Sequence, residues 1–453
     1  MSEQVDAVVI GMGVAGEAVA GRLAGAGLTV VGIEANLVGG ECPYWGCVPS
    51  KMMIRAANLL AEAGRVDGMA GHATVNPSWE PVARRVREEA TADWDDTAAV
   101  DRFTGQGGRF VRAQARLDGP GQVMAGDLTF QASRAVVLAT GHRPVIPPID
   151  GLADTPYWTN RHAIEATELP RSMLVLGGGA IGVELAQAYR RFGAEVTIVE
   201  ATDRLLPVEE PEASVLASSA LKADGITIHT GATASRVAHD SDRFHLTLDD
   251  DTDLTGQRLL VATGRRADLT GLGVDTIGLD PSARAITVDG HLRAAPGLWA
   301  VGDLTGHGAF THVATYQAGI AARDILGQPG PPADYRALPR VTFTDPEIGS
   351  VGLTEAQARN AGLPVTTGTT QVPSTARGWI HKAGNDGFIK LVADTDRGVL
   401  VGATSAGPAG GEVLGMLTLA VHTQVPLAAL RHMIYAYPTF HRGIEDALRD
   451  LNR

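Results

Sequence analysis

The residues with the clearest chemical potential are the only two cysteines of the chain, Cys42 and Cys47, in the run GGECPYWGCVPSK. Four residues separate them, and a predicted helix follows directly. The positive end of a helix lowers the pKa of a thiol, because its unpaired N–H groups stabilise a thiolate. The spacing therefore predicts a redox-active pair that can close into a small disulfide. The alternatives are two inert buried cysteines or half of a metal site, although a zinc site needs four ligands and the sequence has no second pair.

A glycine-rich pattern occurs twice. The runs GMGVAGEAVAGRLAGAGLTVVGIE from Gly11 and GGGAIGVELAQAYRRFGAEVTIVE from Gly177 match in their glycines, and they end on the acids Glu34 and Glu200. Each copy follows an apolar run and indicates a strand, a tight turn, a helix and a second strand. Glycines let the backbone approach a pyrophosphate at the helix N-terminus, and the acid accepts hydrogen bonds from ribose hydroxyls. The repeat predicts two dinucleotide sites, with structural βαβ packing as the alternative.

Two dinucleotide sites beside a cysteine pair indicate electron transfer. A nicotinamide donates hydride to a flavin, and a flavin can pass the electrons to a nearby disulfide. The sequence alone therefore favours a redox enzyme with two different dinucleotides.

Length and composition restrict the class of protein. A chain of 453 residues suggests roughly three domains of about 150 residues each. The formal charge of −13, from 38 basic and 51 acidic residues, disfavours a general binder of nucleic acid or anionic membranes. No apolar run approaches the roughly eighteen residues that span a bilayer, and the first residues show no secretory signal. Two cysteines fit a reducing cytosol, so we expect a cytoplasmic protein without nucleic-acid or membrane partners.

Together, these motifs resemble the flavin-dependent pyridine nucleotide disulfide oxidoreductases, the family of glutathione reductase, dihydrolipoamide dehydrogenase and mercuric reductase. The likeness runs along nearly the whole chain and includes VVLATGHRP at 136–144, VATGRR at 261–266, LWAVGD at 298–303 and FTDPEIGSVGLTE at 343–355. The resemblance implies an α/β fold with two Rossmann-like dinucleotide-binding domains and a C-terminal α+β dimerisation domain. It also implies FAD and NAD as cofactors, with NADP as the alternative to NAD. A homodimer follows from the resemblance, because the active site needs the partner's C-terminal segment.

The resemblance divides the chain into four segments. They are the first part of the FAD domain at 1–148, the nicotinamide domain at 149–267, the returning FAD segment at 268–332 and the dimerisation domain at 333–453. A polar stretch at 62–116 interrupts the first segment and is expected to contain helices. GQPGPPADY at 327–335 is the predicted linker, because no helix or strand interior tolerates so much Gly and Pro. An apolar helix is expected at about 411–422.

The resemblance assigns residues to both cofactors. For FAD it implies Gly11, Gly13 and Gly16 at the pyrophosphate, Glu34 at the adenosine ribose and Asp303 at the ribityl or phosphate part. For the nicotinamide dinucleotide it implies Gly177, Gly179, Gly182 and Glu200. Further cofactor-binding glycines lie in the quoted motifs, namely Gly141, Gly264 and Gly302.

Two of these assignments have open alternatives. A carboxylate at a strand end, such as Asp303, can instead cap the next helix. Glu200 favours NADH, because an acid accepts a hydrogen bond from a 2'-hydroxyl and repels a 2'-phosphate. Arg204 lies four residues further on and can soften this preference, although an Arg in such a segment is more often a surface residue.

The catalytic roles also follow from the resemblance. Cys47 would be the thiolate next to the flavin, and Cys42 would be the exchanging thiol that faces the substrate. Lys51, one helical turn beyond Cys47, resembles the family lysine near the flavin N5 edge, with Glu184 as its carboxylate partner. The alternative is an exposed salt bridge, which contributes at most about 1 kcal/mol.

The chain departs from the family's disulfide reductases near its C-terminus. Tyr437 stands where those enzymes have a proton-shuttling histidine, and Arg442 stands where a Glu orients that histidine. A phenol with a pKa of about 10 stays protonated, whereas an imidazole near 6.5 takes and gives protons. Disulfide exchange is therefore expected to be impaired, while Tyr437 can still donate a hydrogen bond to a bound oxygen, sulfur or metal thiolate. His441 and Glu445 form either a displaced acid and base pair or an exposed helix pair.

Two further features bear on the acceptor. Mercuric reductase also resembles this chain in having a tyrosine at that position, but it delivers metal through a C-terminal cysteine pair that this sequence lacks. Pro43, Tyr44 and Trp45 replace smaller residues between the cysteines. They form either a stacking surface for a planar acceptor such as a quinone or an inward-packed cluster. The scattered histidines predict no resident metal ion.

The sequence therefore predicts an enzyme in which NADH reduces FAD, electrons open the Cys42 and Cys47 disulfide, and a small-molecule acceptor is reduced. The acceptor is a small disulfide, a metal ion or a quinone, and Tyr437 disfavours the first. The alternatives are a flavoprotein redox sensor or scaffold with little turnover, a direct flavin-to-quinone reductase, and thiolate chemistry without the histidine.

Overall fold

The computed structural model describes residues 2–451 and divides into two compact units. The first unit comprises Met1–Ser50, Arg84–Val145 and Gly264–Asp334, and the second comprises Lys51–Ala83, Ile146–Thr263 and Tyr335–Arg453. A division into two units does not test the four predicted segments, which stay a prediction. Residues 327–335, predicted to be the linker, contain neither helix nor strand.

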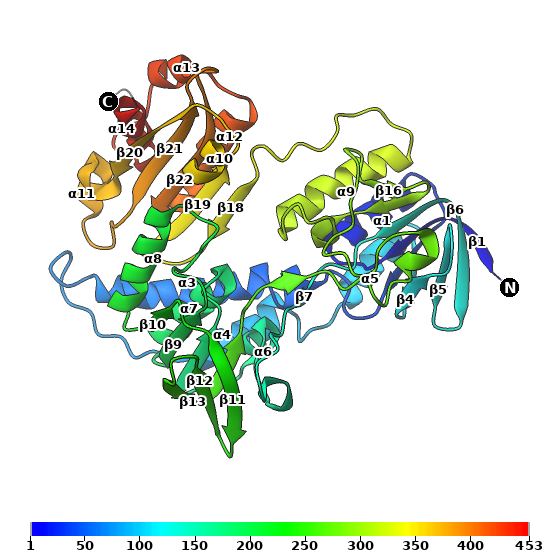
Figure 1. The fold of residues 1–453 in the computed structure, drawn as a ribbon, viewed down its shortest axis with the longest axis horizontal. Helices are drawn as coiled ribbons and strands as arrows, with labels where there is room; N and C mark the ends of the chain where they lie inside the picture. The colour runs from blue at the N-terminus through cyan, green and yellow to red at the C-terminus, as the bar shows by residue number, and fades with distance from the viewer. Residues whose placement is uncertain (1, 452–453) are drawn as a thin grey trace. The chain divides into compact units, whose positions relative to one another are not determined.

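The first unit is built on a mostly parallel sheet (Figure 1). Strand β1 lies between β6 and β2 and pairs in parallel with both. Its core path is β16 (Arg293–Ala295), β17 (Leu298–Ala300), β6 (Leu128–Leu138), β1 (Glu3–Ile10), β2 (Val30–Glu34) and β3 (Arg109–Arg112), with β4 (Ala115–Leu117) and β5 (Gln122–Ala125) added as an antiparallel meander. A strand of a parallel sheet is covered on both faces, which explains the continuous apolar run in β1.

The two faces of β1 enter different cores. Ala7 and Val9 pack with α1 (Val14–Gly25), α5 (Thr97–Gly105) and α9 (Thr311–Ile325). Val8 and Ile10 pack with the meander and with the short helix η3 (Val274–Ile277). The shorter elements of this region are α2 (Glu41–Tyr44), α4 (Glu80–Arg85), the π-helical turn η1 (Val86–Ala90), η4 (Gly302–Thr305) and the paired β7 (Arg143–Pro144) and β15 (Arg265–Arg266). The polar stretch 62–116 contains the expected helices, together with strand β3.

The second unit begins within the long helix α3 (Cys47–Gly64) and contains another parallel sheet. This sheet has the order β10 (Thr227–Thr230), β9 (Glu195–Glu200), β8 (Ser172–Leu176) and β14 (Arg258–Val261), with helices α6 (Asn160–Glu165), α7 (Ala180–Arg191) and α8 (Pro211–Ala223). A three-stranded antiparallel sheet of β11 (Ala234–Asp240), β12 (Arg243–Leu248) and β13 (Asp253–Gly256) follows, and η2 (Leu152–Asp154) precedes them. Both glycine repeats therefore form the predicted strand, turn, helix and strand.

The C-terminal part of the second unit is an antiparallel sheet covered by helices. Its strands are β18 (Pro339–Thr342), β19 (Glu347–Gly352), β22 (Val399–Gly407), β21 (Phe388–Asp394) and β20 (Val365–Gln371), in that order. Its helices are α10 (Glu355–Asn360), η5 (Val372–Ser374), α11 (Ala376–His381), α12 (Gly410–His422), α13 (Leu427–His432), η6 (Phe440–Arg442) and α14 (Gly443–Asp450). The predicted helix at 411–422 is confirmed by α12. The fold class, with two Rossmann-like domains and a C-terminal α+β domain, is also confirmed.

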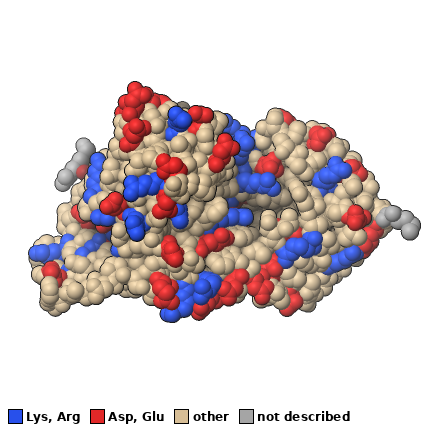
Figure 2. Space-filling view, turned by 90° about the horizontal axis from the view of Figure 1, so that it is seen from below, with Lys and Arg blue, Asp and Glu red and all other residues tan. Residues whose placement is uncertain are grey.

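Two surface properties complete the description. On the face drawn in Figure 2, acidic and basic side chains are intermingled, so that face carries no broad patch of one sign. Within residues 2–451, every helix is too short or too polar to cross a lipid bilayer.

A buried lysine ties the C-terminal sheet to the nucleotide-binding part of the second unit. Lys390 in β21 is 4% exposed, and its Nζ lies 3.1 Å from Glu210, 2.7 Å from Glu212 and 3.0 Å from Glu355. Burial by itself lowers the pKa of Lys390, but the three carboxylates outweigh burial and raise the pKa above its usual value. The lysine is therefore charged and fully paired.

We expect Lys390→Ala to lower the free energy of unfolding by about 3 kcal/mol, because Glu210 would be left buried without its cation. Urea unfolding measures the change. Lys222→Ala, at an exposed position in the last turn of α8, is the control and should change the stability by less than about 0.5 kcal/mol. Equal effects of the two substitutions would show that the buried cluster contributes nothing.

Candidate active site

The two cysteines lie next to each other in the first unit. Cys42 belongs to the short helix α2, Cys47 is the first residue of α3, and no disulfide joins them. A hydrogen bond with Cys47, together with burial, raises the pKa of Cys42. Two sulfurs within hydrogen-bonding reach can be joined by a disulfide after a small movement, so the geometry suits the predicted redox pair.

A threonine that the sequence did not single out contacts this pair. Oγ1 of Thr311 lies 3.2 Å from Sγ of Cys47. Thr311 is the first residue of α9, so Cys47 starts one helix and touches the start of another. Positive helix ends stabilise a thiolate. The arrangement therefore favours Cys47 over the half-buried Cys42 as the thiolate of the reduced pair.

The residues between the cysteines divide into two groups. Tyr44 is 6% exposed and donates a hydrogen bond to the carbonyl of Asp95, so it packs inward. Trp45 is only half-buried, and its ring centre lies 5.8 Å from that of Tyr44 at a tilt of 56°. Tyr44 therefore packs inward. Part of the Trp45 ring remains exposed, in the segment between the two cysteines.

The ion pair between Lys51 and Glu184 is present in the second unit. Nζ of Lys51 lies 2.8 Å from Oε2 of Glu184, which is 6% exposed. The backbone N–H of Phe343 donates to the other carboxylate oxygen at 2.8 Å, and the ammonium lies 4.7 Å from the centre of the Phe343 ring. A buried carboxylate held from two sides is not half of an exposed salt bridge, so that alternative does not describe this pair. Sequence reasoning missed Phe343.

The first glycine motif has the geometry of a pyrophosphate cradle. Gly11 adopts a φ of +90°, and a Cβ on Gly16 would lie 1.9 Å from the carbonyl oxygen of Gly11. A Cβ on Gly13 would meet no atom closer than 3.9 Å. Gly13 is the N-cap of α1, and no side chain caps that helix. Gly11 makes the tight turn, Gly16 allows close packing, and Gly13 keeps the helix N-terminus open to an anion.

The second motif repeats this geometry. Gly177 has a φ of +107°, and a Cβ on Gly182 would lie 2.1 Å from the carbonyl oxygen of Gly177. Around a Cβ on Gly179, the N-cap of α7, there is no atom within 4 Å among the described residues. Both cradles therefore fit the two dinucleotides that the repeat predicts.

The two acids are held against their glycine turns. Glu34 accepts hydrogen bonds from the N–H groups of Met12 and Asn36, each at 2.8 Å. Glu200 accepts from the N–H groups of Gly178 at 2.6 Å and Thr202 at 2.7 Å. A carboxylate has about four lone-pair sites, so each acid retains acceptor capacity for ribose hydroxyls.

The sequence left Arg204 open as a cation near the nucleotide or a surface residue, and the structure shows it half-buried. Its guanidinium donates to Ser214 Oγ at 2.7 Å and to the carbonyls of Pro207 at 2.8 Å and Glu209 at 3.0 Å. These bonds fold the side chain back onto its own loop.

The remaining predicted cofactor residues meet in the first unit. The paired strands β7 and β15 bring the motifs of Gly141 and Gly264 together, and the N–H of Val145 donates to the carbonyl of Gly264 at 2.9 Å. Gly302 (φ +75°) and Asp303 form the start of η4. Since the N-cap of α9 is Phe310, Asp303 does not cap that helix. Burial raises the pKa of Asp303, and His142 and Arg265 oppose this shift.

His142 supplies a second observation that fits a cofactor site. Both ring nitrogens are buried, and neither has a hydrogen-bond partner of normal geometry among the described residues. An unsatisfied buried polar group costs about 1–3 kcal/mol. On the loop predicted to contact FAD, such a group fits a site whose bound ligand supplies the partner. His142 was missed because the predicted motif role rested on its glycine.

The C-terminal segment presents Tyr437 to the outside. Tyr437 is 70% exposed, and the guanidinium of Arg442 lies 5.5 Å from the centre of its ring. Glu445 lies 3.0 Å from Arg442 and is therefore paired with it. His441 contacts Thr439 Oγ1 at 3.5 Å. The structure thus gives Glu445 an arginine partner instead of the helix partner His441.

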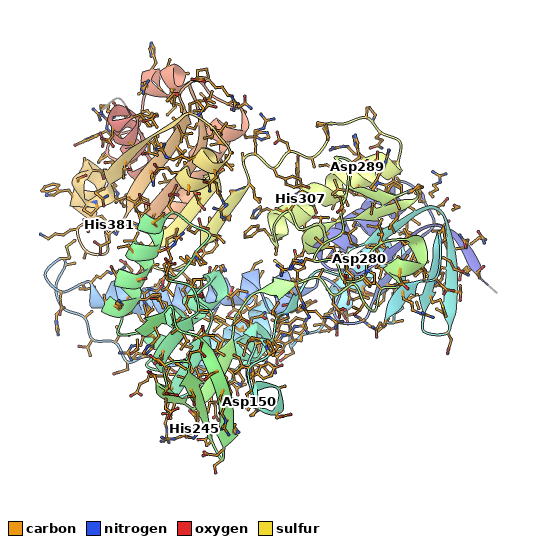
Figure 3. All side chains as sticks on the ribbon, viewed as in Figure 1. Asp150, His245, Asp280, Asp289, His307 and His381 are labelled. Carbon is orange, nitrogen blue, oxygen red and sulfur yellow. The ribbon has the colours of Figure 1, made fainter. Side chains whose placement is uncertain are left out.

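No resident metal centre is apparent within residues 2–451, where His, Cys, Asp and Glu form no group of three or more with suitable geometry. The histidines labelled in Figure 3 come from separate elements: His245 from β12, His307 from the loop before α9 and His381 from the end of α11.

Comparisons with known proteins cover almost the entire chain. The family model of pyridine nucleotide-disulphide oxidoreductases matches residues 5–318, and the model of the dimerisation domain of these enzymes matches residues 338–448.

Two curated relatives and one solved structure illustrate the likeness. The chain is 34% identical to dihydrolipoyl dehydrogenase from Chlorobaculum tepidum, covering 99% of this chain and 97% of that protein. It is 33% identical to mercuric reductase from Streptomyces lividans, covering 97% and 94%. The Cu(II) complex of the HOCl-induced flavoprotein disulfide reductase RclA from Escherichia coli superposes with a TM-score of 0.87 at 26% identity, covering 99% of each chain. The chain therefore belongs to the pyridine nucleotide-disulphide oxidoreductase family, whose members use FAD and NAD(P)H, and it carries the dimerisation domain of that family.

Proposed function

We propose that this oxidoreductase uses NADH to reduce the Cys42 and Cys47 pair and that the reduced pair delivers electrons to a thiophilic metal ion. The observation that carries the proposal is Tyr437, an exposed phenol at the position where disulfide reductases have their histidine. Reducing a disulfide requires a proton for the departing thiolate, and a phenol near pKa 10 supplies protons poorly at neutral pH. Reducing a metal ion requires electrons and sulfur ligands but no proton at that step.

The cysteines are suited to this acceptor. When bound, FAD carries electron pairs from the nicotinamide to the disulfide. Cys47 then retains negative charge at the start of α3, beside Thr311, while Cys42 keeps its proton because its pKa is raised. A soft metal ion binds thiolates and displaces that proton from Cys42. In the overall reaction NADH loses two electrons, the metal gains two, and one proton is released.

The supporting residues have defined tasks in the proposal. The resemblance assigns Lys51 to the cofactor as a fixed positive charge. Glu184 orients that ammonium and is itself held by the N–H of Phe343, so the charge is positioned before the cofactor arrives. Tyr437 would come from the partner subunit of a homodimer and donate a hydrogen bond to the bound thiolate or metal ligand. His441 plays no proton-transfer role in this proposal, because Glu445 is paired with Arg442.

Similar proteins support the class of acceptor. One curated relative is a mercuric reductase, and one structural relative was solved as a Cu(II) complex.

We further propose NADH as the donor in preference to NADPH. Glu200 is 9% exposed and fixed at the end of β9, where it would repel a 2'-phosphate. Arg204, the nearest candidate cation in the sequence, directs its donors to its own loop.

A quinone is the second candidate acceptor. The half-buried Trp45 offers an aromatic surface beside Cys42 on which a planar ring can stack. A quinone can also take electrons directly from a flavin, so this acceptor does not need the cysteines.

We expect Tyr437→His to raise the reduction of a small soluble disulfide by at least about tenfold, because an imidazole restores general acid catalysis. Steady-state NADH consumption with the disulfide, with Hg²⁺ or Cu²⁺ salts and with a quinone measures the effect. Tyr157→His in the nucleotide-binding part is the matched control and should leave all rates near wild type. An unchanged disulfide rate in Tyr437→His would contradict the proton argument.

Cys42→Ala separates the acceptors in the same assay. Loss of metal-dependent turnover with retention of quinone turnover supports the proposed relay. If every activity survives, the cysteines are not in the electron path. A single stoichiometric reduction of the wild type, without turnover on any acceptor, would instead identify a redox sensor.

We expect Gly13→Ala to fold normally but to bind FAD at least about tenfold more weakly, which corresponds to about 1.4 kcal/mol. The added Cβ would lie no closer than 3.9 Å to any described atom, and it would project toward the proposed position of the pyrophosphate. Flavin content and fluorescence titration measure affinity, and thermal unfolding of the apoprotein measures stability. Gly25→Ala on the same helix, where the new Cβ also has open space, should match wild type in both. Normal FAD affinity in Gly13→Ala would remove this glycine from the cofactor site.

We expect Glu200→Ala to raise kcat/KM with NADPH, relative to NADH, by roughly tenfold, because removal of a carboxylate ends the repulsion of a 2'-phosphate. The ratio of the two kcat/KM values is the readout. Arg204→Lys should leave the ratio unchanged, since the side chain serves its own loop. A fall in NADPH use in Arg204→Lys would show that the arginine turns toward the nucleotide.

A further inference from the structure

We propose that His142 takes up a proton when FAD binds, so that the affinity of the chain for its cofactor falls as the pH rises. The inference rests on the proposed FAD site and adds to it a titrating group that the sequence-based assignment did not include. It concerns a single side chain of the first unit and the charges around it.

The position of His142 is fixed by its main chain. Gly141, with a φ of +67°, turns the chain after β6, and β7 begins directly after His142. Nη2 of Arg265 donates to the carbonyl of His142 at 2.8 Å, and β7 is paired with β15. The main chain that carries the imidazole is therefore held between two motif segments.

The imidazole nitrogens of His142 lack hydrogen-bond partners of normal geometry among the described residues. Nδ1 and Nε2 are both buried. A neutral imidazole needs one acceptor and one donor, whereas an imidazolium needs two acceptors. A dinucleotide is rich in acceptors, namely its phosphoryl oxygens and ribityl hydroxyls. A phosphoryl oxygen only accepts, so a ring nitrogen facing one would have to carry a proton, and an acceptor at the second nitrogen as well would require the imidazolium.

Two charged groups act on the ring. Burial lowers the pKa of His142, the carboxylate of Asp303 opposes that shift, Arg265 adds to it, and a backbone contact with Asp303 also raises the pKa. Glu41, the neighbour of Cys42 in the sequence, lies 3.4 Å from Nη1 of Arg265 and partly neutralises the positive charge of that arginine. Without cofactor, burial prevails and the imidazole is neutral at about pH 7. The negative pyrophosphate shifts this balance toward the protonated ring.

The sign of the linkage follows. A ligand that raises the pKa of a group binds more tightly where the group is protonated. The gain in affinity is fully present below the pKa of the free chain and is lost as the pH rises through the pKa of the complex. Between these two values, the dissociation constant for FAD should rise by about tenfold per pH unit.

Calorimetric titration of the apoprotein with FAD at about pH 7, in two buffers of different ionisation enthalpy, counts the protons taken up. We expect uptake approaching about one proton per FAD in the wild type and little uptake in His142→Gln, whose amide still offers hydrogen bonds. His72→Gln, at a side chain that is 80% exposed, should retain the uptake of the wild type.

The outcomes are distinguishable. FAD binding by the wild type without proton uptake overturns this inference and leaves the proposed function intact. Equal uptake in the wild type and His142→Gln assigns the proton to another group and also overturns it. Failure of the wild type to bind FAD at all would defeat the proposed function itself. Should His142→Gln not fold, the pH dependence of the wild-type dissociation constant decides, and a flat profile rejects the inference.

Discussion

A backbone must come within contact distance of a doubly charged pyrophosphate, and this requirement governs both nucleotide-binding parts of the molecule. Only a residue without Cβ leaves a helix N-terminus open at Gly13 and at Gly179, where an added Cβ would meet no described atom closer than 3.9 Å. The flanking glycines are needed for packing within the chain and not for contact with the ligand. Gly16 and Gly182 would clash with a carbonyl of their own turn, so they set how closely each helix lies to its strand. The same short motif therefore contains positions that control folding and a position that controls binding.

The cysteine pair also depends on the positive ends of helices. Cys47 begins α3 and touches the first residue of α9, so helix ends that attract anions in the glycine motifs here favour a thiolate. Lys51 follows one turn later on α3, and its charge is held by a carboxylate that is itself hydrogen-bonded from behind. Preorganised charge of this kind costs no reorganisation during reaction, because the protein has already fixed it during folding.

The sequence was sufficient to predict local geometry. The glycine spacings, the acids Glu34 and Glu200, the cysteine pair and helix α12 were all visible as patterns of neighbouring residues. Partners brought together by folding were not visible. Thr311 lies 264 positions from Cys47, and Phe343 lies 159 from Glu184.

The sequence also did not predict the partners of charged side chains near the surface. The sequence left the direction of Arg204 open, because it does not reveal that three acceptors of its own loop surround the guanidinium. Helical spacing alone likewise failed at Glu445, whose carboxylate pairs with Arg442 and not with His441. In both cases several partners lie within reach along the chain, and only the folded geometry decides which of them is used.

The replacement of a histidine by Tyr437 is best understood together with the position of the imidazole of His142. A disulfide reductase places an imidazole where protons must cross to the substrate, whereas this chain places a phenol there and an imidazole, His142, beside Asp303 in the proposed cofactor site. In the proposed function, the acceptor side therefore relies on reactions in which electrons move without a proton from an imidazole. In the further inference, the imidazole of His142 takes up a proton with FAD, which couples pH to the occupancy of the cofactor site. The two proposals together imply that changes of pH act on the fraction of the enzyme that carries FAD more than on the rate of electron transfer to a metal ion.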